Sequence, residues 1–500
     1  MGRDGNGSLL TVIGRHGPAS RGCLETQFLF THDQDANVWN MSSEGLAAAR
    51  QKMAEGGVHQ LAIDVFTHYY GELESGATGT IHEADIEPLR EVGHAGMLSV
   101  SEDDQRAAAG VTAVIKLNGG LGTTMGMSQA KTLLEIRPGL TFLDIIVGQV
   151  RRVRQEYDVR LPVLFMNSFR TQDDTLAALA AYPDLAVPGL PLDFLQNREP
   201  KLRIDTLAPV EWPADPTLEW CPPGHGDLYT ALAVSGVLDR LISQGFAYAS
   251  VSNADNLGAA PDPAMMAWFA GSGAPYAAEV CRRTPADVKG GHLVIRRGDG
   301  RLVLRETVQT AAEDAEAAAD PARHRYFHTN NLWFDLRPLK AALIARNGVL
   351  GLPLIRNEKN VDPADPSSPR VVQIETAMGA AVEVFDGATA IEVDRSRFLP
   401  VKTTNDLLLL RSDAYAVDDD FRVHSHGADP PLVRLDDRFY STIADFDARF
   451  PAVPSIVGAR SLTVHGDWKF GAGVTVTGDA VLDDLGRPAS VEPATALGQG

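Results

Sequence analysis

A short β-branched segment that runs directly into a cluster of glycines limits the fold of this sequence more than any other feature. Residues 111–116 read Val-Thr-Ala-Val-Ile-Lys, and Leu-Asn-Gly-Gly-Leu-Gly-Thr-Thr-Met-Gly follows, ending at Gly126. β-branched residues favour a buried strand, and glycines let the next loop bring backbone N–H groups close to a ligand. A strand followed by such a loop is typical of α/β proteins whose ligands bind at the carboxyl ends of parallel strands.

The pattern after this loop alternates between helix and strand. Residues 141–157 carry apolar side chains at helical spacing, and residues 161–166 form an apolar run typical of a buried strand. Residues 228–244 predict a helix that stops at Gly245, and residues 247–252 predict the next strand. The sequence therefore predicts a largely parallel α/β sheet.

The two ends of the chain differ from this core. Residues 43–54 predict a helix, but the first hundred or so residues look peripheral because their periodicity is weak. Near the other end, short apolar runs around Trp468 and Val476 are separated by glycines and lack helical spacing. These runs fit either a few rungs of a β-helix or a small β-sheet appended to the core.

Composition excludes several classes of function. The 500 residues carry a net charge of −20, which disfavours a general nucleic-acid binder because neutralising phosphates needs a surplus of Lys and Arg. No apolar run approaches the ~20 residues of a membrane span, and the polar start lacks a secretory signal. Three widely spaced cysteines argue against a disulfide framework and against a cysteine zinc site. We expect a cytoplasmic protein in which positive charge for any anionic ligand is concentrated locally.

The glycine loop suits a phosphate or a flat base, although a glycine-rich turn is also explained by geometry alone. It is not a Walker A loop, because Ala130 precedes Lys131-Thr132, and its spacing also fails the dinucleotide pattern. Lys131 lies within reach of whatever the loop holds, unless it is an ordinary surface lysine. Lys402 follows two arginines in an otherwise acidic protein.

Two further loops lie beside predicted helices and strands. Residues 221–227 read Cys-Pro-Pro-Gly-His-Gly-Asp, a rigid turn that either presents backbone amides to an anion or only caps the next helix through Asp227. Residues 252–258 follow a predicted strand and contain Asp255, which either holds Mg²⁺ or forms an Asx turn.

Three later clusters are polar without being strongly charged, at residues 287–292, 329–333 and 373–379. Their amides, carboxylate and glycines suit sugar hydroxyls, which need both donors and acceptors, but each cluster also fits turns and caps. No nucleophile elbow, His-Glu-x-x-His pair or low-pKa cysteine context accompanies them.

Ten motifs in one collinear order, between about residues 111 and 480, resemble the eukaryotic-type UTP–glucose-1-phosphate uridylyltransferase (UDP-glucose pyrophosphorylase) family. They are KLNGGLGTTMG, KTLLEIRPGLTFLD, MNSF, QN-x-x-PK, PPGHGD, VSNADNLGA, DVKGGH, HTNNLW, QIETAMGA and RSRFLPVKT. Thr124 and Met125 stand where related UDP-N-acetylhexosamine enzymes usually carry arginine, which favours the glucose branch. His328 departs from the family, which usually has asparagine there.

The resemblance implies a fold in three parts. These are a peripheral, partly helical region at residues 1–108, a Rossmann-like (GT-A-like) nucleotidyltransferase core with a mixed sheet at 109–418, and a small C-terminal left-handed β-helix-like domain at 419–500.

The resemblance also implies a reaction, in which UTP and glucose 1-phosphate give UDP-glucose and pyrophosphate with the help of Mg²⁺. We expect in-line attack on the α-phosphorus without a covalent enzyme intermediate. The alternatives are a UDP-sugar pyrophosphorylase that uses another hexose or N-acetylhexosamine 1-phosphate, and a non-catalytic UDP-sugar binding protein. We expect no nucleic-acid or membrane partner, and a homo-oligomer stays open.

Matching the motifs position by position implies the site residues. Lys131 and Lys402 match lysines that bind phosphates, and Asp255 matches the metal-binding carboxylate; these three are the expected catalytic residues. The expected nucleotide-binding residues are Leu117, Asn118, Gly119, Gly120, Met166, Gln196, Pro223, Gly224 and Asn253. The residues expected around the sugar phosphate are His225, Gly291, Asn330, Asn331 and Glu375.

Overall fold

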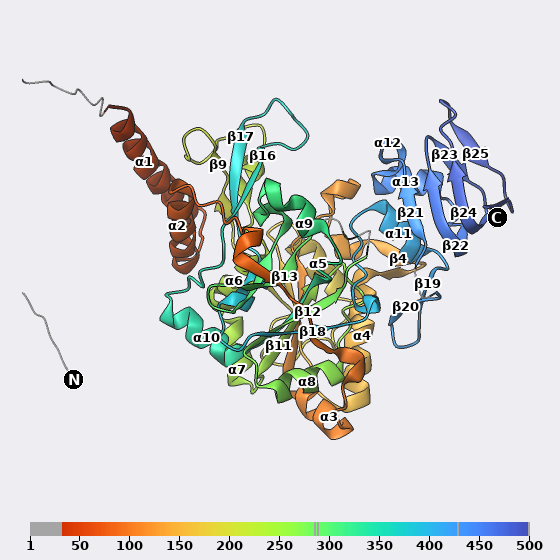
Figure 1. Ribbon diagram of the computed structural model, residues 1–500, viewed down its shortest axis with the longest axis horizontal. Helices are drawn as coiled ribbons and strands as arrows, with labels where there is room; N and C mark the ends of the chain where they lie inside the picture. The colour runs from red at the N-terminus through yellow and green to blue at the C-terminus, as the bar shows by residue number, and fades with distance from the viewer. Residues whose placement is uncertain (1–32, 285–286, 288–289, 428–429, 499–500) are drawn as a thin grey trace, which may run out of the picture. The chain divides into compact units, whose positions relative to one another are not determined.

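The structure is a computed structural model that describes residues 33–498 except 285–286, 288–289 and 428–429 (Figure 1). The chain divides into two units, Met1–Met41 and Ser42–Gly500, and all elements after helix α1 (Asp33–Glu55) belong to the second. In the described part of the chain, no helix is long and apolar enough to cross a membrane.

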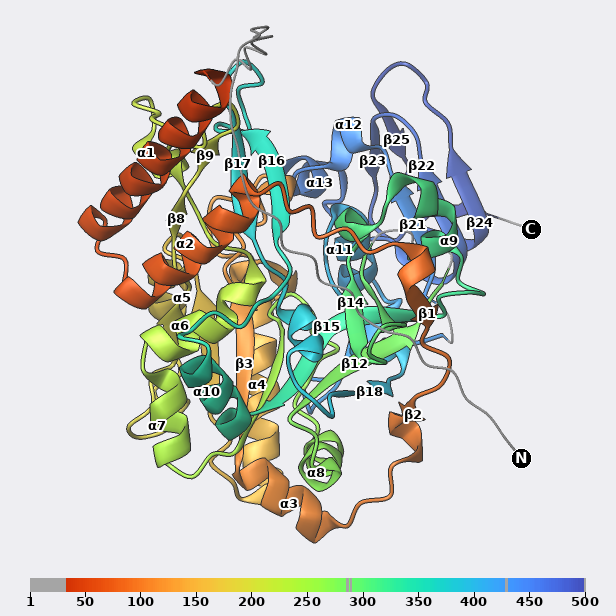
Figure 2. The same cartoon turned by 60° about the vertical axis from the view of Figure 1, so that its left-hand side comes forward.

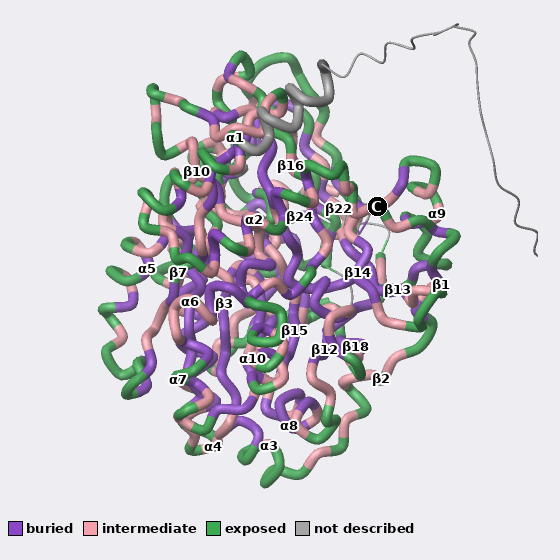
Figure 3. Tube along the Cα trace, turned by 90° about the vertical axis from the view of Figure 1, so that its left-hand side faces the viewer, coloured by how far each residue is buried: buried purple, intermediate pink, exposed green. Residues whose placement is uncertain are grey.

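An eight-stranded mixed sheet forms the centre of the second unit, and its strands are largely buried (Figure 3). In spatial order the strands are β2 (Gly93–His94), β18 (Thr389–Glu392), β12 (Tyr276–Arg282), β15 (Tyr326–Asp335), β11 (Tyr248–Asn253), β3 (Thr112–Asn118), β6 (Val163–Asn167) and β7 (Asp193–Leu195). Only β15 runs antiparallel to its neighbours β11 and β12. The other pairs are parallel, which confirms the predicted α/β core with a mixed sheet.

Helices cover both faces of this sheet (Figure 2). Side chains alternate along β3, so Val114 joins one apolar cluster while Ala113 and Ile115 join another. The first cluster receives α3 (Glu102–Gly110), α4 (Phe142–Tyr157) and α8 (Pro263–Ser272), and the second receives α6 (Leu228–Val234), α7 (Val237–Ser243) and α10 (Leu336–Ala345).

Local sequence explains where two of these helices begin and end. Thr141 and Asp144 form a capping box at the start of α4, which matches the helix predicted for residues 141–157. The single helix predicted for residues 228–244 is wrong, because α6 ends at Val234 and α7 begins after Gly236. Gly236 has φ +70°, a conformation that favours glycine and interrupts a helix.

The segment before the glycine loop contributes strands to two sheets. β1 (Ile86–Pro88) pairs with β13 (His292–Arg296), which pairs with β14 (Leu302–Arg305), and β2 forms one edge of the central sheet. Helix α2 (Gln60–Glu74) packs its apolar face against a smaller sheet of β16 (Ile355–Asn360), β17 (Arg370–Glu375) and β9 (Leu202–Arg203).

The C-terminal region, where the sequence predicted either β-helix rungs or a small β-sheet, contains parallel sheets. One sheet has the order β21 (Leu432–Leu435), β22 (Ser455–Val464), β24 (Thr475–Leu482), β26 (Ala496–Leu497), and the second pairs β23 (Trp468–Phe470) with β25 (Ala489–Val491). The strands from β22 to β26 alternate between the two sheets along the chain.

The remaining elements are short. The helices are α5 (Gln172–Leu179), α9 (Ala315–Ala319), α11 (Thr404–Arg411), α12 (Asp437–Tyr440) and α13 (Ile443–Arg449). The strand pairs are β4 (Glu135–Arg137) with β5 (Leu140–Thr141), β8 (Glu199–Pro200) with β10 (Trp220–Cys221), and β19 (Tyr415–Val417) with β20 (Val423–Ser425).

Candidate active site

A cavity of about 260 Å³ is lined by residues from β11, β15, the loops beside β13 and β14, and the segment before α11. Five residues expected from the sequence line it: His225, Asn253, Gly291, Asn330 and Lys402. They come from five separate segments of the chain, and the fold brings them to one place.

The glycine loop and the loop after β10 meet beside Gln196. A Cβ added to Gly119 would lie 2.8 Å from the Gln196 side-chain oxygen, so a side chain there would displace the end of Gln196. Gln196 donates a hydrogen bond of 2.8 Å to the Gly224 carbonyl. Met166 is buried at the end of β6, next to Leu117 in the register of β3 and β6.

Asn118, in contrast, uses its side chain within the protein. Its amide donates to Asn167 (2.8 Å) and to Thr175 (2.9 Å), and its oxygen accepts from Thr132. Asn118 therefore fixes the base of the glycine loop, and only its backbone is left for a ligand. Met125 is buried, and the side chain of Thr124 lies outside the described part of the structure.

The loop at residues 223–227 is held against Thr376. Gly226 donates to the Thr376 carbonyl (2.8 Å), and Thr376 donates back to the Pro223 carbonyl (3.0 Å). A Cβ on Gly226 would lie 2.2 Å from the Thr376 hydroxyl oxygen, so this contact depends on glycine. The loop is therefore rigid, as its prolines and glycines predict.

His225 and Asp227 carry the titratable groups of this loop. The Met378 N–H donates to His225 Nδ1 at 3.0 Å, and burial lowers the pKa of His225 to about 4. Asp227 does not cap α6, since its carboxylate instead accepts from the Asn197 backbone (2.6 Å) and side chain (2.8 Å). Burial raises the pKa of Asp227 to about 7.

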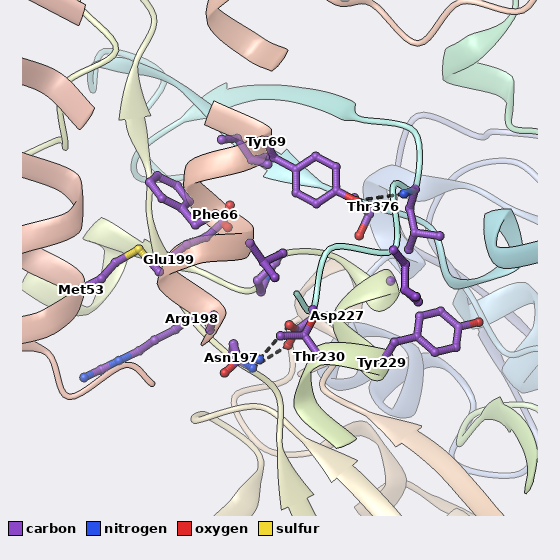
Figure 4. Close-up of a pocket in the computed structure, with 18 residues that line it drawn as sticks. Met53, Phe66, Tyr69, Asn197, Arg198, Glu199, Asp227, Tyr229, Thr230 and Thr376 are labelled. Carbon is purple, nitrogen blue, oxygen red and sulfur yellow. Dashed lines mark hydrogen bonds between the residues drawn. The ribbon is translucent and has the colours of Figure 1, made fainter. Parts of the chain in front are cut away.

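A second cavity of about 30 Å³ lies on the side of this loop that faces α2 (Figure 4). Its labelled residues include Asn197, Glu199, Asp227 and Tyr69, and dashed lines mark the bonds from Asn197 to Asp227. Burial raises the pKa of Glu199 well above its ordinary value. This cavity holds a few water-sized volumes at most, so the larger one is the candidate site.

Lys131 and Asp255 form an ion pair with Nζ 2.7 Å from Oδ2. Lys131 also donates to the carbonyl of Val401, the residue before Lys402. Lys131 and Lys402 were predicted from motifs far apart in the sequence. This bond links Lys131 to the residue next to Lys402, so the two lysines come from segments in direct contact. In the described part of the chain, Lys402 makes no ion pair at salt-bridge distance, and its ammonium group is free to meet an anion.

Asn331 and Glu375 do not line the cavity. Asn331 is a buried residue of β15, and its amide donates to Glu279 (3.0 Å) and to the Arg397 carbonyl (3.2 Å). Glu375 accepts a 2.7 Å bond from Asn357. The Asn331 amide is therefore engaged within the protein, whereas one carboxylate oxygen of Glu375 is bonded to Asn357.

The structure adds lining residues that the sequence did not predict, among them Glu306, Thr307, Phe327, Phe398 and Pro400. His328 also lines the cavity. Burial raises the pKa of Glu306, although the charge of Lys402 opposes this. No motif marks Glu306. Phe398 and Pro400 lie within the motif RSRFLPVKT. From the sequence alone, only the charged residues of this motif indicated binding to phosphate.

No group of three or more His, Cys, Asp or Glu side chains in the described residues can hold a metal on its own. Mg²⁺ is commonly held by one or two carboxylates, together with waters and substrate phosphates. Asp255, partly exposed and beside Lys131, fits this second kind of site.

Comparisons with known proteins agree with this geometry. Residues 63–477 match the family model described as UTP--glucose-1-phosphate uridylyltransferase. A probable UTP--glucose-1-phosphate uridylyltransferase of Schizosaccharomyces pombe is 40% identical over 374 residues, which are 74% of this chain and 72% of that protein. The UTP--glucose-1-phosphate uridylyltransferase of Saccharomyces cerevisiae is 40% identical over 380 residues, 74% of this chain and 73% of its own length.

Solved structures extend the likeness to the fold. The UDP-glucose pyrophosphorylase from Leishmania major, solved in open and closed forms, is 40% identical with a TM-score of 0.86, covering 91% of this chain and 98% of that one. A variant of the same enzyme in complex with UDP-glucose gives a TM-score of 0.85 at the same identity and coverage. The chain thus belongs to the UTP–glucose-1-phosphate uridylyltransferase family.

Proposed function

We propose that the larger cavity is where this chain, as a UTP–glucose-1-phosphate uridylyltransferase, converts UTP and glucose 1-phosphate to UDP-glucose and pyrophosphate. The observation that carries this assignment is the convergence of His225, Asn253, Gly291, Asn330 and Lys402 on one cavity. The relative of known structure that binds UDP-glucose shares the fold over most of this chain.

The nucleotide occupies the side of the site formed by the glycine loop. Backbone groups of residues 117–120 meet the nucleotide, while Gln196 and Gly224 pair with uracil and Met166 packs beside it. A primary amide suits this task because it offers both a donor and an acceptor to the base edge. Pro223 keeps the loop rigid, and Asn253 approaches the ribose or the phosphates from the end of β11.

The sugar phosphate occupies the side formed by His225, Gly291 and Asn330. Asn331 supports this side indirectly, because its amide already binds Glu279, and Glu375 lies on this side with one carboxylate oxygen bonded to Asn357. The Nδ1 of His225 accepts a backbone N–H, which leaves Nε2–H as the donor of the neutral ring.

The chemistry needs no general base. A sugar phosphate has a second pKa near ~6, so it is largely dianionic at neutral pH and attacks the α-phosphorus directly, in line with the leaving pyrophosphate. The difficulty is to bring two polyanions together. Lys131 and Lys402 relieve the repulsion, and rigid positioning supplies most of the remaining rate.

Asp255 is the residue that would hold Mg²⁺. When bound, the ion neutralises phosphate charge during the transfer. Asp255→Asn keeps the size of the side chain and removes its charge, and we expect the activity to require more Mg²⁺ than the wild type. A magnesium titration of initial rates tests this, and an unchanged titration curve contradicts the assignment.

The activity itself is tested by pyrophosphate release from UTP with a panel of sugar 1-phosphates. We expect glucose 1-phosphate to be preferred over galactose and N-acetylglucosamine 1-phosphates. A preference for another sugar phosphate would establish the alternative sugar specificity, and no release would favour a UDP-sugar binding protein. UTP–pyrophosphate exchange without any sugar phosphate would contradict the mechanism without a covalent intermediate.

The alternating parallel strands after residue 454 support a further structural assignment. They correspond to rungs of a left-handed β-helix-like domain within residues 419–500, beside a core at 109–418 and a peripheral region at 1–108. An experimental structure of the full chain tests this assignment, which requires successive rungs to stack along one axis with a left-handed turn.

A further inference from the structure

Glu279 is a buried carboxylate outside the cavity that receives four side-chain hydrogen bonds. Arg397 donates two, from Nε at 2.9 Å and from Nη2 at 2.8 Å, while Asn331 and Trp333 each donate one at 3.0 Å. Only 1% of the Glu279 side chain is exposed. Burial alone would raise the pKa of Glu279, but the charge and hydrogen bonds of Arg397 hold it below its ordinary value. A buried charge of this kind is kept only when it is fully paired.

The position of Glu279 in the sheet explains its first task. In the register of β12 and β15, Ala278 faces Leu332 and Val280 faces His328, so Glu279 alone lies opposite residues 329–331. This is a β-bulge, a feature that often re-aims a side chain at a functional site. Asn330 stands in the middle of the bulge with φ +59° and lines the cavity.

Glu279 fastens the bulge on both sides of Asn330. Its backbone carbonyl accepts from the Thr329 hydroxyl at 2.8 Å, and its carboxylate accepts from the Asn331 amide. A positive φ is uncommon for residues other than glycine, and asparagine is among those that tolerate it. The two hydrogen bonds that Glu279 accepts, from Thr329 and Asn331, therefore hold the backbone on both sides of Asn330 and fix the orientation of Asn330.

The second task concerns the segment at residues 395–402, which carries Lys402. Arg397, bonded to Glu279, is part of this segment, and its carbonyl also accepts from Asn331 and Asn256. The Leu399 N–H donates to the Asn256 side chain at 2.8 Å. Asn256 and Asn331 thus complete a network that ends at the same carboxylate.

We infer that Glu279 is a positioning residue that fixes Asn330 and Lys402 relative to each other. It acts through the bulge on one side and through Arg397 on the other, and it touches no substrate. The inference rests on the proposed roles of Asn330 at the sugar and Lys402 at the phosphate. Because Asn330 and Lys402 act on the same bound reactants, an error in their relative placement lowers the rate even when both side chains are intact.

The test is a double-mutant cycle of Glu279→Gln with Lys402→Ala. Glutamine keeps the size of the side chain but cannot accept both Arg397 donors. We expect Glu279→Gln to lower kcat about 100-fold, since a misplacement of ~1 Å costs about that much. If Glu279 acts by placing Lys402, the factor by which Lys402→Ala lowers kcat should be at least about tenfold smaller in the Glu279→Gln background than in the wild type. Additive effects contradict the inference.

Glu392→Gln is the matched control. Glu392 is another buried carboxylate of the central sheet, paired with Arg282 at 2.7 Å and with Tyr326 at 3.2 Å. Its side-chain partners lie outside the bulge and outside residues 395–402. We expect its effect to add to that of Lys402→Ala, which separates positioning from a general loss of stability.

Hydrogen exchange of the full chain gives a readout that does not depend on the reaction. In Glu279→Gln we expect faster amide exchange both at residues 328–332 and at 395–402, and an unchanged rate at either segment contradicts the inference. Should Glu279→Gln fail to fold, Arg397→Lys keeps the charge without the two-pronged contact and enters the same measurements. A fully active Lys402→Ala variant would refute the phosphate role in the proposed function, whereas the exchange result would still decide the role of Glu279.

Discussion

Lys131 and Lys402 meet the site in different ways. Lys131 is tied to Asp255 and to the carbonyl of Val401, whereas Lys402 forms no ion pair in the described residues. When phosphates bind, Lys131 must weaken or rearrange its bonds to Asp255 and Val401, whereas Lys402 has no ion pair to give up. Lys402 is therefore the cleaner probe of electrostatic catalysis.

We expect Lys402→Ala to lower kcat about 100-fold, which is typical for the loss of one group that stabilises transition-state charge. Because the side chain is exposed, the free energy of unfolding should change by less than about 0.5 kcal/mol. Steady-state kinetics and urea denaturation measure the two quantities. Near-normal turnover would remove Lys402 from the phosphate site.

The two histidines of the cavity predict how stability depends on pH. Burial lowers the pKa of His225 and of His328 from an ordinary 6.5 to about 4. Between these values the unfolded chain binds protons that the folded chain does not, so these groups make the free energy of unfolding fall as pH drops from 6.5 to 4. Asp227 acts in the opposite direction, because its raised pKa favours the folded state at low pH.

His328→Asn removes one of the two buried imidazoles of the cavity. We expect the free energy of unfolding of this variant to fall less steeply below pH 6.5 than that of the wild type. Urea denaturation at a series of pH values measures the slope. His465→Asn, at an exposed position, serves as the control and should leave the slope unchanged.

Candidate residues could be predicted from the sequence where the residue type itself suggests a ligand. Residues that line the cavity only because the fold brings them there could not. Lysines, a glycine loop and an aspartate after a strand indicate phosphate and metal chemistry, and the structure brings them together. Glu306 carries no such mark, because its place in the cavity depends on how β14 ends. Asn331 also stands in a polar motif, but its amide bonds to Glu279 and to the Arg397 carbonyl within a bulge that no periodicity predicts.

At the scale of elements, long periodic segments were predictable and short ones were not. Helix α4 and strands β3, β6 and β11 match the predicted segments closely, because their apolar patterns extend over several residues. β1 and β2 are three and two residues long, which is too short for an apolar pattern to show. They are recognised as strands only because they pair with β13 and β18. They place part of the apparently peripheral region inside the sheets of the core.

The segment at residues 395–402 passes close to the loop after β11. A Cβ on Gly258 would lie 2.3 Å from the Ser396 carbonyl oxygen and 2.9 Å from the Arg397 carbonyl carbon. Both contacts are backbone atoms, so the segment must shift to accept a side chain.

We therefore expect Gly258→Ala to lower kcat about tenfold or more by displacing Lys402. Gly271→Ala, in α8, is the matched control, because a Cβ there meets nothing within 4 Å. It should keep full activity and gain up to about 1 kcal/mol of stability. Kinetics and thermal unfolding of both variants test this, and equal activity of the two would contradict the expected shift.

At the scale of the whole molecule, the charge of −20 is compatible with anionic substrates because the cations are local. The residues that line the cavity come from segments between residue 225 and residue 402, so a bound ligand contacts several separate parts of the core. Ligand binding to the folded state alone raises stability by about 2.7 kcal/mol at about a hundred times Kd.

We expect UDP-glucose to raise the melting temperature, while ADP-glucose at the same concentration leaves it nearly unchanged, because we propose that Gln196 and Gly224 pair with uracil. Differential scanning fluorimetry measures both shifts. Gln196→Ala should reduce the difference between the two ligands. Equal shifts in the wild type would argue against a uracil site at Gln196.

The pairing of β2 with β18 also bears on how the chain is made. β2 lies before the glycine loop, and its partner follows nearly all of the core, so this edge of the sheet stays open on the ribosome until β18 emerges. Open strand edges recruit other chains, and late long-range pairing slows folding. A nascent chain stalled before β18 would thus present an aggregation-prone edge, and the synthesis of this protein calls for either rapid completion or a chaperone that covers that edge.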